Sequence, residues 1–124
     1  MEKLQFTAKT VSGSHRGRDL GTPTINLALE DVPRTLREGI HACQVTLDET
    51  PLDAVMHYGP RPVFNDTPSC EVHILDRTIA AMPPSVTVMV VGYLREVRNF
   101  PNVDAMMEQI ARDIEDARAM LHGA

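Results

Sequence analysis

Residues 86–94 read Val-Thr-Val-Met-Val-Val-Gly-Tyr-Leu, and they form the most β-branched of the strand-like segments in the chain. β-branched and aromatic side chains favour extended strands. Four other segments alternate with the period of two that half-buried strands show, and Gly, Pro, Asn and Asp separate them. These segments are residues 4–11, 40–47, 52–58 and 69–75. The chain up to residue 95 is therefore predicted to be mostly β.

The C-terminal segment changes to the period of an amphipathic helix. Asn102 is suited to cap its N-terminus, and Gly123 is suited to end it. Apolar residues recur there at spacings of three and four, and its methionines are expected to fill gaps in the core. The apolar positions are Val103, Met106, Met107, Ile110, Ile114, Ala117 and Leu121. Several short strands followed by one helix predict a closed antiparallel barrel with the helix packed on its outside.

Length and charge limit the kinds of partner. A chain of 124 residues is long enough for one core and too short for two, so residues 1–124 are expected to form one domain. A formal net charge of −5 gives little support to a nucleic-acid partner. Cys43 and Cys70 lack C-x-x-C spacing and are expected to be buried, reduced thiols. No signal-like or membrane-spanning apolar run is present, so we expect a cytoplasmic protein without a membrane partner. We also expect a monomer.

Residues 13–26 read Gly-Ser-His-Arg-Gly-Arg-Asp-Leu-Gly-Thr-Pro-Thr-Ile-Asn, a composition suited to binding phosphate. Glycines let backbone N–H groups approach an anion, and arginines supply donors that match phosphate oxygens. Thr and Asn oxygens are hard ligands that Mg²⁺ accepts. The same residue types also build ordinary surface loops, so both interpretations stay open at this point. The candidate phosphate-binding residues are Gly13, Arg16, Gly17, Arg18, Gly21, Thr24 and Asn26, of which Thr24 and Asn26 are also the candidate metal ligands.

The predicted strand at residues 69–75 has one apolar and one polar face. Ser69, Glu71 and His73 share the polar face, since side chains alternate along a strand. This face either meets water or lines a binding site, and spacing alone favours water. Glu71 is the carboxylate on that face and is the candidate general base.

Several motifs, in order along the chain, resemble the riboflavin kinase family. Residues 17–26 resemble its G-R-x-L-G-[FI]-P-T-A-N signature, and residues 71–74 match its E-[VT]-H-[IL] strand. Residues 91–100 resemble V-G-Y-L-R-P-E-K-N-F, and the positions from Gln109 to Arg118 resemble the closing Q-I-x-x-D-x-x-x-A-[RK] helix. Two shorter resemblances lie at residues 39–42 and 58–64.

The resemblance implies a six-stranded Greek-key barrel with a C-terminal helix, acting as an ATP:riboflavin 5′-phosphotransferase that makes FMN. In that case Thr24 and Asn26 hold Mg²⁺ and the ATP phosphates, and Glu71 takes the proton from the ribityl 5′-hydroxyl. The loop before Thr24 covers ATP. Residues 94–100, including Phe100, and the closing helix contact the flavin. Arg95 either stacks on the flavin ring or forms an ordinary surface ion pair at the end of its strand.

Some positions depart from the family pattern. Thr22 and Ile25 replace the usual residues of the signature, and residues 76–84 lack the D-x-Y-G turn. Val63 and His41 also differ from the usual residues. The metal and base positions are kept while the pocket walls change, which is typical of a divergent kinase. The alternative is a non-catalytic flavin- or nucleotide-binding relative that acts as a sensor or partner module.

Overall fold

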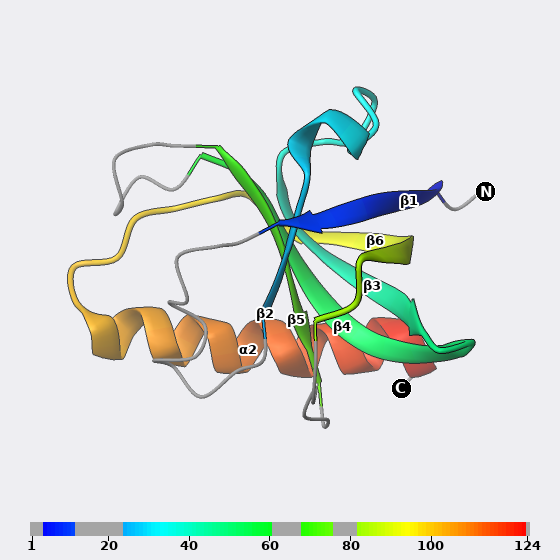
Figure 1. Cartoon of the computed structure of the whole chain (residues 1–124). Coiled ribbons are helices and arrows are strands. Elements are labelled where there is room, and N and C mark those ends of the chain that lie inside the picture. Colours follow the sequence, from blue (N-terminus) through cyan, green and yellow to red (C-terminus); the bar gives the residue numbers. More distant parts are fainter. Residues whose placement is uncertain (1–3, 12–23, 61–67, 76–81, 124) are drawn as a thin grey trace.

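The computed structural model describes residues 4–11, 24–60, 68–75 and 82–123. Its six strands close into an antiparallel barrel in the order β1-β2-β5-β4-β3-β6 (Figure 1). The predicted fold class is thereby confirmed. The elements are β1 (Leu4–Val11), β2 (Thr24–Leu27), the 3₁₀ turn η1 (Leu29–Asp31), β3 (Gly39–Leu47), β4 (Thr50–Gly59), β5 (Ser69–Ile74), β6 (Ser85–Arg95) and α2 (Val103–His122).

The inward-facing residues of all six strands form one apolar core. Cys43 and Cys70 belong to this core as free, buried thiols, as the sequence predicted. Burial, and to a smaller extent the charge of Glu71, raises the pKa of the Cys70 thiol to about 12. Both effects favour the protonated thiol. The largest fully buried side chains of the barrel are Ile25, Met56, Ile74, Val45, Val72, Val88, Cys43 and Cys70.

Strand β2 is a feature that the sequence pattern did not reveal. Thr24–Leu27 looked like the end of a phosphate-binding loop, but it pairs with both β1 and β5 and completes the barrel. Four residues are too few to establish a period of two. Ile25, which stands where the family has a small residue, has no exposed surface. The larger side chain therefore fills the barrel core.

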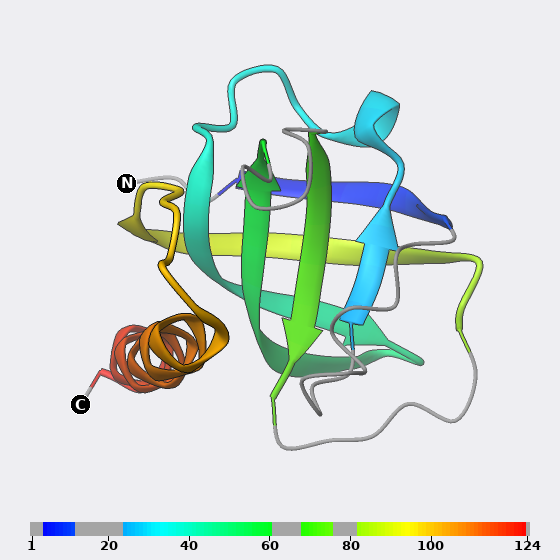
Figure 2. The same cartoon turned by 90° about the vertical axis from the view of Figure 1, so that its left-hand side faces the viewer.

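Helix α2 lies outside the barrel, where Figure 2 shows it nearly end-on. It packs on β3, β4 and β6, and Ala117 is fully buried there with Ile40, Ala42, Val55 and Leu75. The expected caps are present: the Asn102 side chain accepts from the Ala105 N–H at 2.8 Å, and Gly123 is left-handed with φ of 69°. No helix among the described segments is long and apolar enough to cross a membrane.

The core prediction for this helix was too broad. Val103 is 61% exposed and Met107 is 41% exposed, because the first turns of α2 extend beyond the strands that it covers (Figure 1). Met120 is also 41% exposed, yet its sulfur would overlap a Cβ placed on Gly92. Glycine at position 92 therefore leaves room for the Met120 side chain of α2 against β6.

Candidate active site

A row of directly paired residues crosses five neighbouring strands on the outer surface of the barrel. Asn26 of β2 pairs with Glu71 of β5, and Glu71 pairs with His57 of β4. His57 pairs in turn with Ile40 of β3, which pairs with Arg95 of β6. Directly paired residues on antiparallel strands point to the same face, with Cβ atoms about 4.5–5.5 Å apart. We call these five positions the Asn26–Arg95 row.

Glu71, the candidate base, is buried within this row. Only 5% of it is exposed, although it lies on the polar face of β5. The expectation from spacing alone, that this face meets water, is therefore wrong at Glu71. Asn26 and His57 flank it on the two adjacent strands. A carboxylate withdrawn from water needs polar neighbours, and the register supplies one on each side.

A second pair of residues, parallel to the Asn26–Arg95 row, places Thr24 beside β5. Thr24 pairs with His73, and the Thr24 Oγ1 lies 3.2 Å from the His73 Nδ1. Thr24 and Asn26 are two residues apart, so both side chains project from the outer face of β2. The two candidate metal ligands and the candidate base thus come from adjacent strands and share one surface.

The remaining candidates for phosphate binding lie outside the described residues. These are Gly13, Arg16, Gly17, Arg18 and Gly21. The described chain before them ends at Val11, which pairs directly with Asn26, and it resumes at Thr24. Both ends of that segment therefore meet at the Asn26 end of the row. Thr22, Val63 and most of the departing turn at residues 76–84 also lie outside the described part of the chain.

The opposite end of the row is fixed to α2 by a buried ion pair. The Arg95 Nε donates to Asp113 Oδ1 at 2.9 Å, and its Nη2 donates to Oδ2 at 2.8 Å. The side chains of Arg95 and Asp113 are 14% and 5% exposed. Gln109 donates to the same carboxylate at 3.0 Å, and the Arg95 Cζ lies 5.8 Å from the centroid of the Phe100 ring.

Arg95 therefore forms a buried ion pair. The surface ion pair, which was one of the two interpretations of Arg95 from the sequence, is not what the structure shows. The contact between Asp113 and Arg95 was not predicted from the sequence. One signal was available: Asp113 is a charged residue between the apolar helix positions Ile110 and Ala117, on the side that faces the barrel. His57 had no such signal, because its position opposite Glu71 follows only from the strand register.

His41, one of the departures from the family pattern, is buried beside the row. It is 3% exposed, its Nε2 lies 2.7 Å from the Arg37 carbonyl oxygen, and its ring meets Tyr93 edge-on at 5.4 Å. Arg37 lies over the same Tyr93 ring, with its Cζ 3.9 Å from the centroid. Burial lowers the pKa of His41, and the Arg37 charge adds to this, while the hydrogen bond to the carbonyl acts in the opposite direction.

The lowered pKa of His41 predicts a loss of stability in mild acid. An unfolded histidine binds a proton below about pH 6.5, whereas folded His41 resists protonation, so acid favours the unfolded state. The contribution of neutral His41 to the free energy of unfolding is complete above about pH 6.5. It decreases as the pH falls below about 6.5, by up to ~1.4 kcal/mol per pH unit. Urea unfolding at pH 7.5 and 5.5 should show a smaller decrease for His41→Phe than for the unmodified chain. Equal decreases would contradict the assignment, because both proteins keep the other histidines.

Comparison with known proteins adds the decisive observation. The family model described as riboflavin kinase (flavokinase) matches residues 1–121. The chain belongs to the riboflavin kinase family. Membership identifies it as a kinase enzyme. It is 28% identical to the riboflavin kinase of Yarrowia lipolytica, over 97% of this chain and 82% of that protein.

Other relatives in the riboflavin kinase family are longer. The chain is 32% identical to the bifunctional riboflavin kinase/FMN adenylyltransferase of Escherichia coli, over 91% of this chain and 36% of that enzyme. Among solved structures, the barrel resembles a Streptococcus pneumoniae protein described as a macrolide-efflux protein, with a TM-score of 0.81 and 27% identity over 94% of this chain and 38% of that one. It shares its fold with the riboflavin kinase of Trypanosoma brucei, with a TM-score of 0.68 and 23% identity over 98% and 81% of the two chains.

Proposed function

We propose that this protein transfers the γ-phosphoryl group of ATP to the 5′-hydroxyl of riboflavin, giving FMN and ADP. The observation that carries the proposal is the position of Glu71, a buried carboxylate directly opposite Asn26 and one strand from Thr24. Family membership supports the same reaction.

In this proposal Glu71 acts as the general base. The proton of the 5′-hydroxyl passes to the Glu71 carboxylate as the oxygen forms a bond to the γ-phosphorus. The bond between that phosphorus and the bridging oxygen breaks, and ADP leaves. Most of the catalysis of phosphoryl transfer comes from positioning and from stabilising the phosphate charge, and the base receives the displaced proton. The burial of Glu71 favours this role, because few water molecules can compete for its oxygens.

Thr24 and Asn26 are the proposed holders of Mg²⁺ and the phosphates. Their hydroxyl and amide oxygens are hard ligands on one face of β2, and Mg²⁺ is commonly held by one or two protein groups together with substrate phosphates. Among the described residues, no group of three or more His, Cys, Asp or Glu is suited to hold a metal ion. When bound, Mg²⁺ would neutralise phosphate charge.

The flavin ring is proposed to lie at the Arg95 end of the row. The bidentate contact with Asp113 holds the Arg95 guanidinium in one orientation, and Phe100 supplies an aromatic surface beside it. A fixed guanidinium plane and an aromatic ring are both suited to packing against a flat heterocycle. The candidate arginines of the segment before Thr24 remain predicted contacts of the ATP phosphates.

Riboflavin-dependent release of ADP tests the proposal. Purified protein with ATP and Mg²⁺ should release ADP only when riboflavin is added, with a rate that saturates in both substrates. ADP release that ignores riboflavin, or no release with both substrates present, would contradict the proposed reaction.

Asn26→Ala is expected to raise the KM for Mg-ATP by roughly 10- to 100-fold, the effect of losing one interaction with a charged group. The affinity for riboflavin should stay unchanged, because Asn26 lies at the phosphate end of the row. Initial rates over a matrix of ATP and Mg²⁺ concentrations give the first quantity, and flavin fluorescence titration gives the second. An unchanged dependence on both ATP and Mg²⁺ would remove Asn26 from this role.

A further inference from the structure

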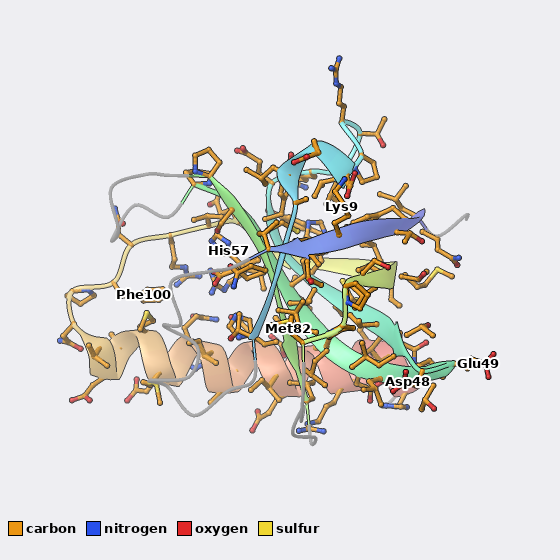
Figure 3. The ribbon with its side chains drawn as sticks, viewed as in Figure 1. Lys9, Asp48, Glu49, His57, Met82 and Phe100 are labelled. Atoms are coloured by element: carbon orange, nitrogen blue, oxygen red, sulfur yellow. The ribbon has the colours of Figure 1, made fainter. Side chains whose placement is uncertain are left out.

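His57 occupies the middle of the Asn26–Arg95 row, between the two ends to which the proposed function assigns different parts of riboflavin. Neighbouring strands lie about 4.8 Å apart, so Glu71 and Arg95 are separated by three such spacings, ~14 Å along the sheet. His57 is one spacing from Glu71 and two from Arg95. In Figure 3, His57 and Phe100 lie on the same side of the crossing strands. The connection from β6 to the start of α2 runs on that side too.

The proposed function requires the substrate to cross this part of the sheet. If the 5′-hydroxyl lies at Glu71 and the flavin ring lies near Arg95, the ribityl chain that joins them must leave Glu71 over β4, because α2 covers the β3 position of the row at Ile40. That chain carries secondary hydroxyl groups, each of which can donate and accept a hydrogen bond. Leaving such groups without partners in a site shielded from water lowers affinity, so residues below the chain should be able to bond them.

Only one of the two intervening row positions can do so. Ile40 is apolar, 4% exposed and packed with the residues that α2 covers. The neighbouring outward position on β4, Val55, is also apolar and belongs to the same cluster. His57 is half-buried and carries an imidazole, which in its neutral form offers one donor and one acceptor. We propose that His57 is a specificity-determining residue that hydrogen-bonds the ribityl chain of riboflavin.

This inference rests on the proposed function, and a comparison of two flavins tests it. Riboflavin carries the ribityl chain, whereas lumiflavin has a methyl group in its place, so lumiflavin reports on the ring site alone. His57→Phe removes both nitrogens but keeps a flat ring. We expect its Kd for riboflavin, measured by quenching of flavin fluorescence, to rise about 10-fold, the effect of one lost hydrogen bond, while its Kd for lumiflavin stays the same. His57→Gln keeps a donor and an acceptor and should recover most of the riboflavin affinity.

Two outcomes would overturn the assignment: equal weakening of both flavins in His57→Phe, which indicates a structural role, and no change for either flavin. A second test uses the unmodified protein and therefore does not depend on whether a variant folds. Riboflavin analogues that lack single ribityl hydroxyls should bind more weakly than riboflavin, and equal binding of all of them would also overturn the assignment. Protein that binds riboflavin but makes no FMN would instead contradict the proposed function, and the flavin comparison would still test His57.

Discussion

Glu71→Gln is expected to lower kcat by about 10²- to 10⁴-fold, the usual contribution of a positioned general base. Glutamine has nearly the same shape as glutamate, so the buried position between Asn26 and His57 should still be filled and the barrel should still fold. The amide cannot take the proton of the substrate hydroxyl. Initial rates of FMN formation at saturating riboflavin and Mg-ATP measure the loss, and unfolding in urea checks the fold.

A matched control makes the same change of charge elsewhere. Glu49 lies in the turn between β3 and β4, at the opposite extremity of the molecule from Phe100 and far from His57 (Figure 3). Glu49→Gln should keep full activity. If Glu71→Gln were as active as Glu49→Gln, Glu71 would not be the base.

Asp113→Ala is expected to give the largest loss of stability, about 3–5 kcal/mol in the free energy of unfolding. The reason is that Arg95 would keep its charge in a position that is only 14% exposed after its bidentate partner is removed. Gln109 would lose a contact with the same carboxylate. Urea unfolding monitored by circular dichroism measures the change.

Two controls separate this effect from the loss of any ion pair. Lys9→Ala breaks the pair with Asp31, in which the lysine side chain is 63% exposed, and should cost less than about 1 kcal/mol. Replacing both partners of the buried pair, as Arg95→Met with Asp113→Leu, should restore much of the stability, because apolar side chains can replace a buried pair at little cost. A loss for Asp113→Ala no larger than for Lys9→Ala would contradict the assignment.

Periodicity was sufficient for the longer elements of the fold. The segments that became β1, β3, β4, β5 and β6 each contain enough residues to show strand alternation, and α2 carries both of its expected caps. Strand β2 was missed because four residues cannot show a period. The exposure of Val103 and Met107 was missed because a helical stripe gives the direction of a face but not the length of helix that the barrel covers.

The sequence identified individual site residues better than their arrangement. Thr24, Asn26 and Glu71 were all singled out, but the direct pairing of Asn26 with Glu71 depends on a register between strands more than forty residues apart in sequence. The position of His57 opposite Glu71 depends on a second register, the one between β4 and β5. The contact of Arg95 with Asp113 joins the end of a strand to the middle of a helix, and no local pattern specifies where those two elements meet.

The formation of FMN tests the central claim most directly. Unmodified protein and Glu71→Gln would be incubated side by side with riboflavin, ATP and Mg²⁺, and the flavins and nucleotides would be separated by chromatography. We predict that the unmodified protein forms one FMN for each ADP, and that Glu71→Gln forms almost none while still binding riboflavin. Absence of FMN from the unmodified protein, or equal amounts from both proteins, would contradict the account.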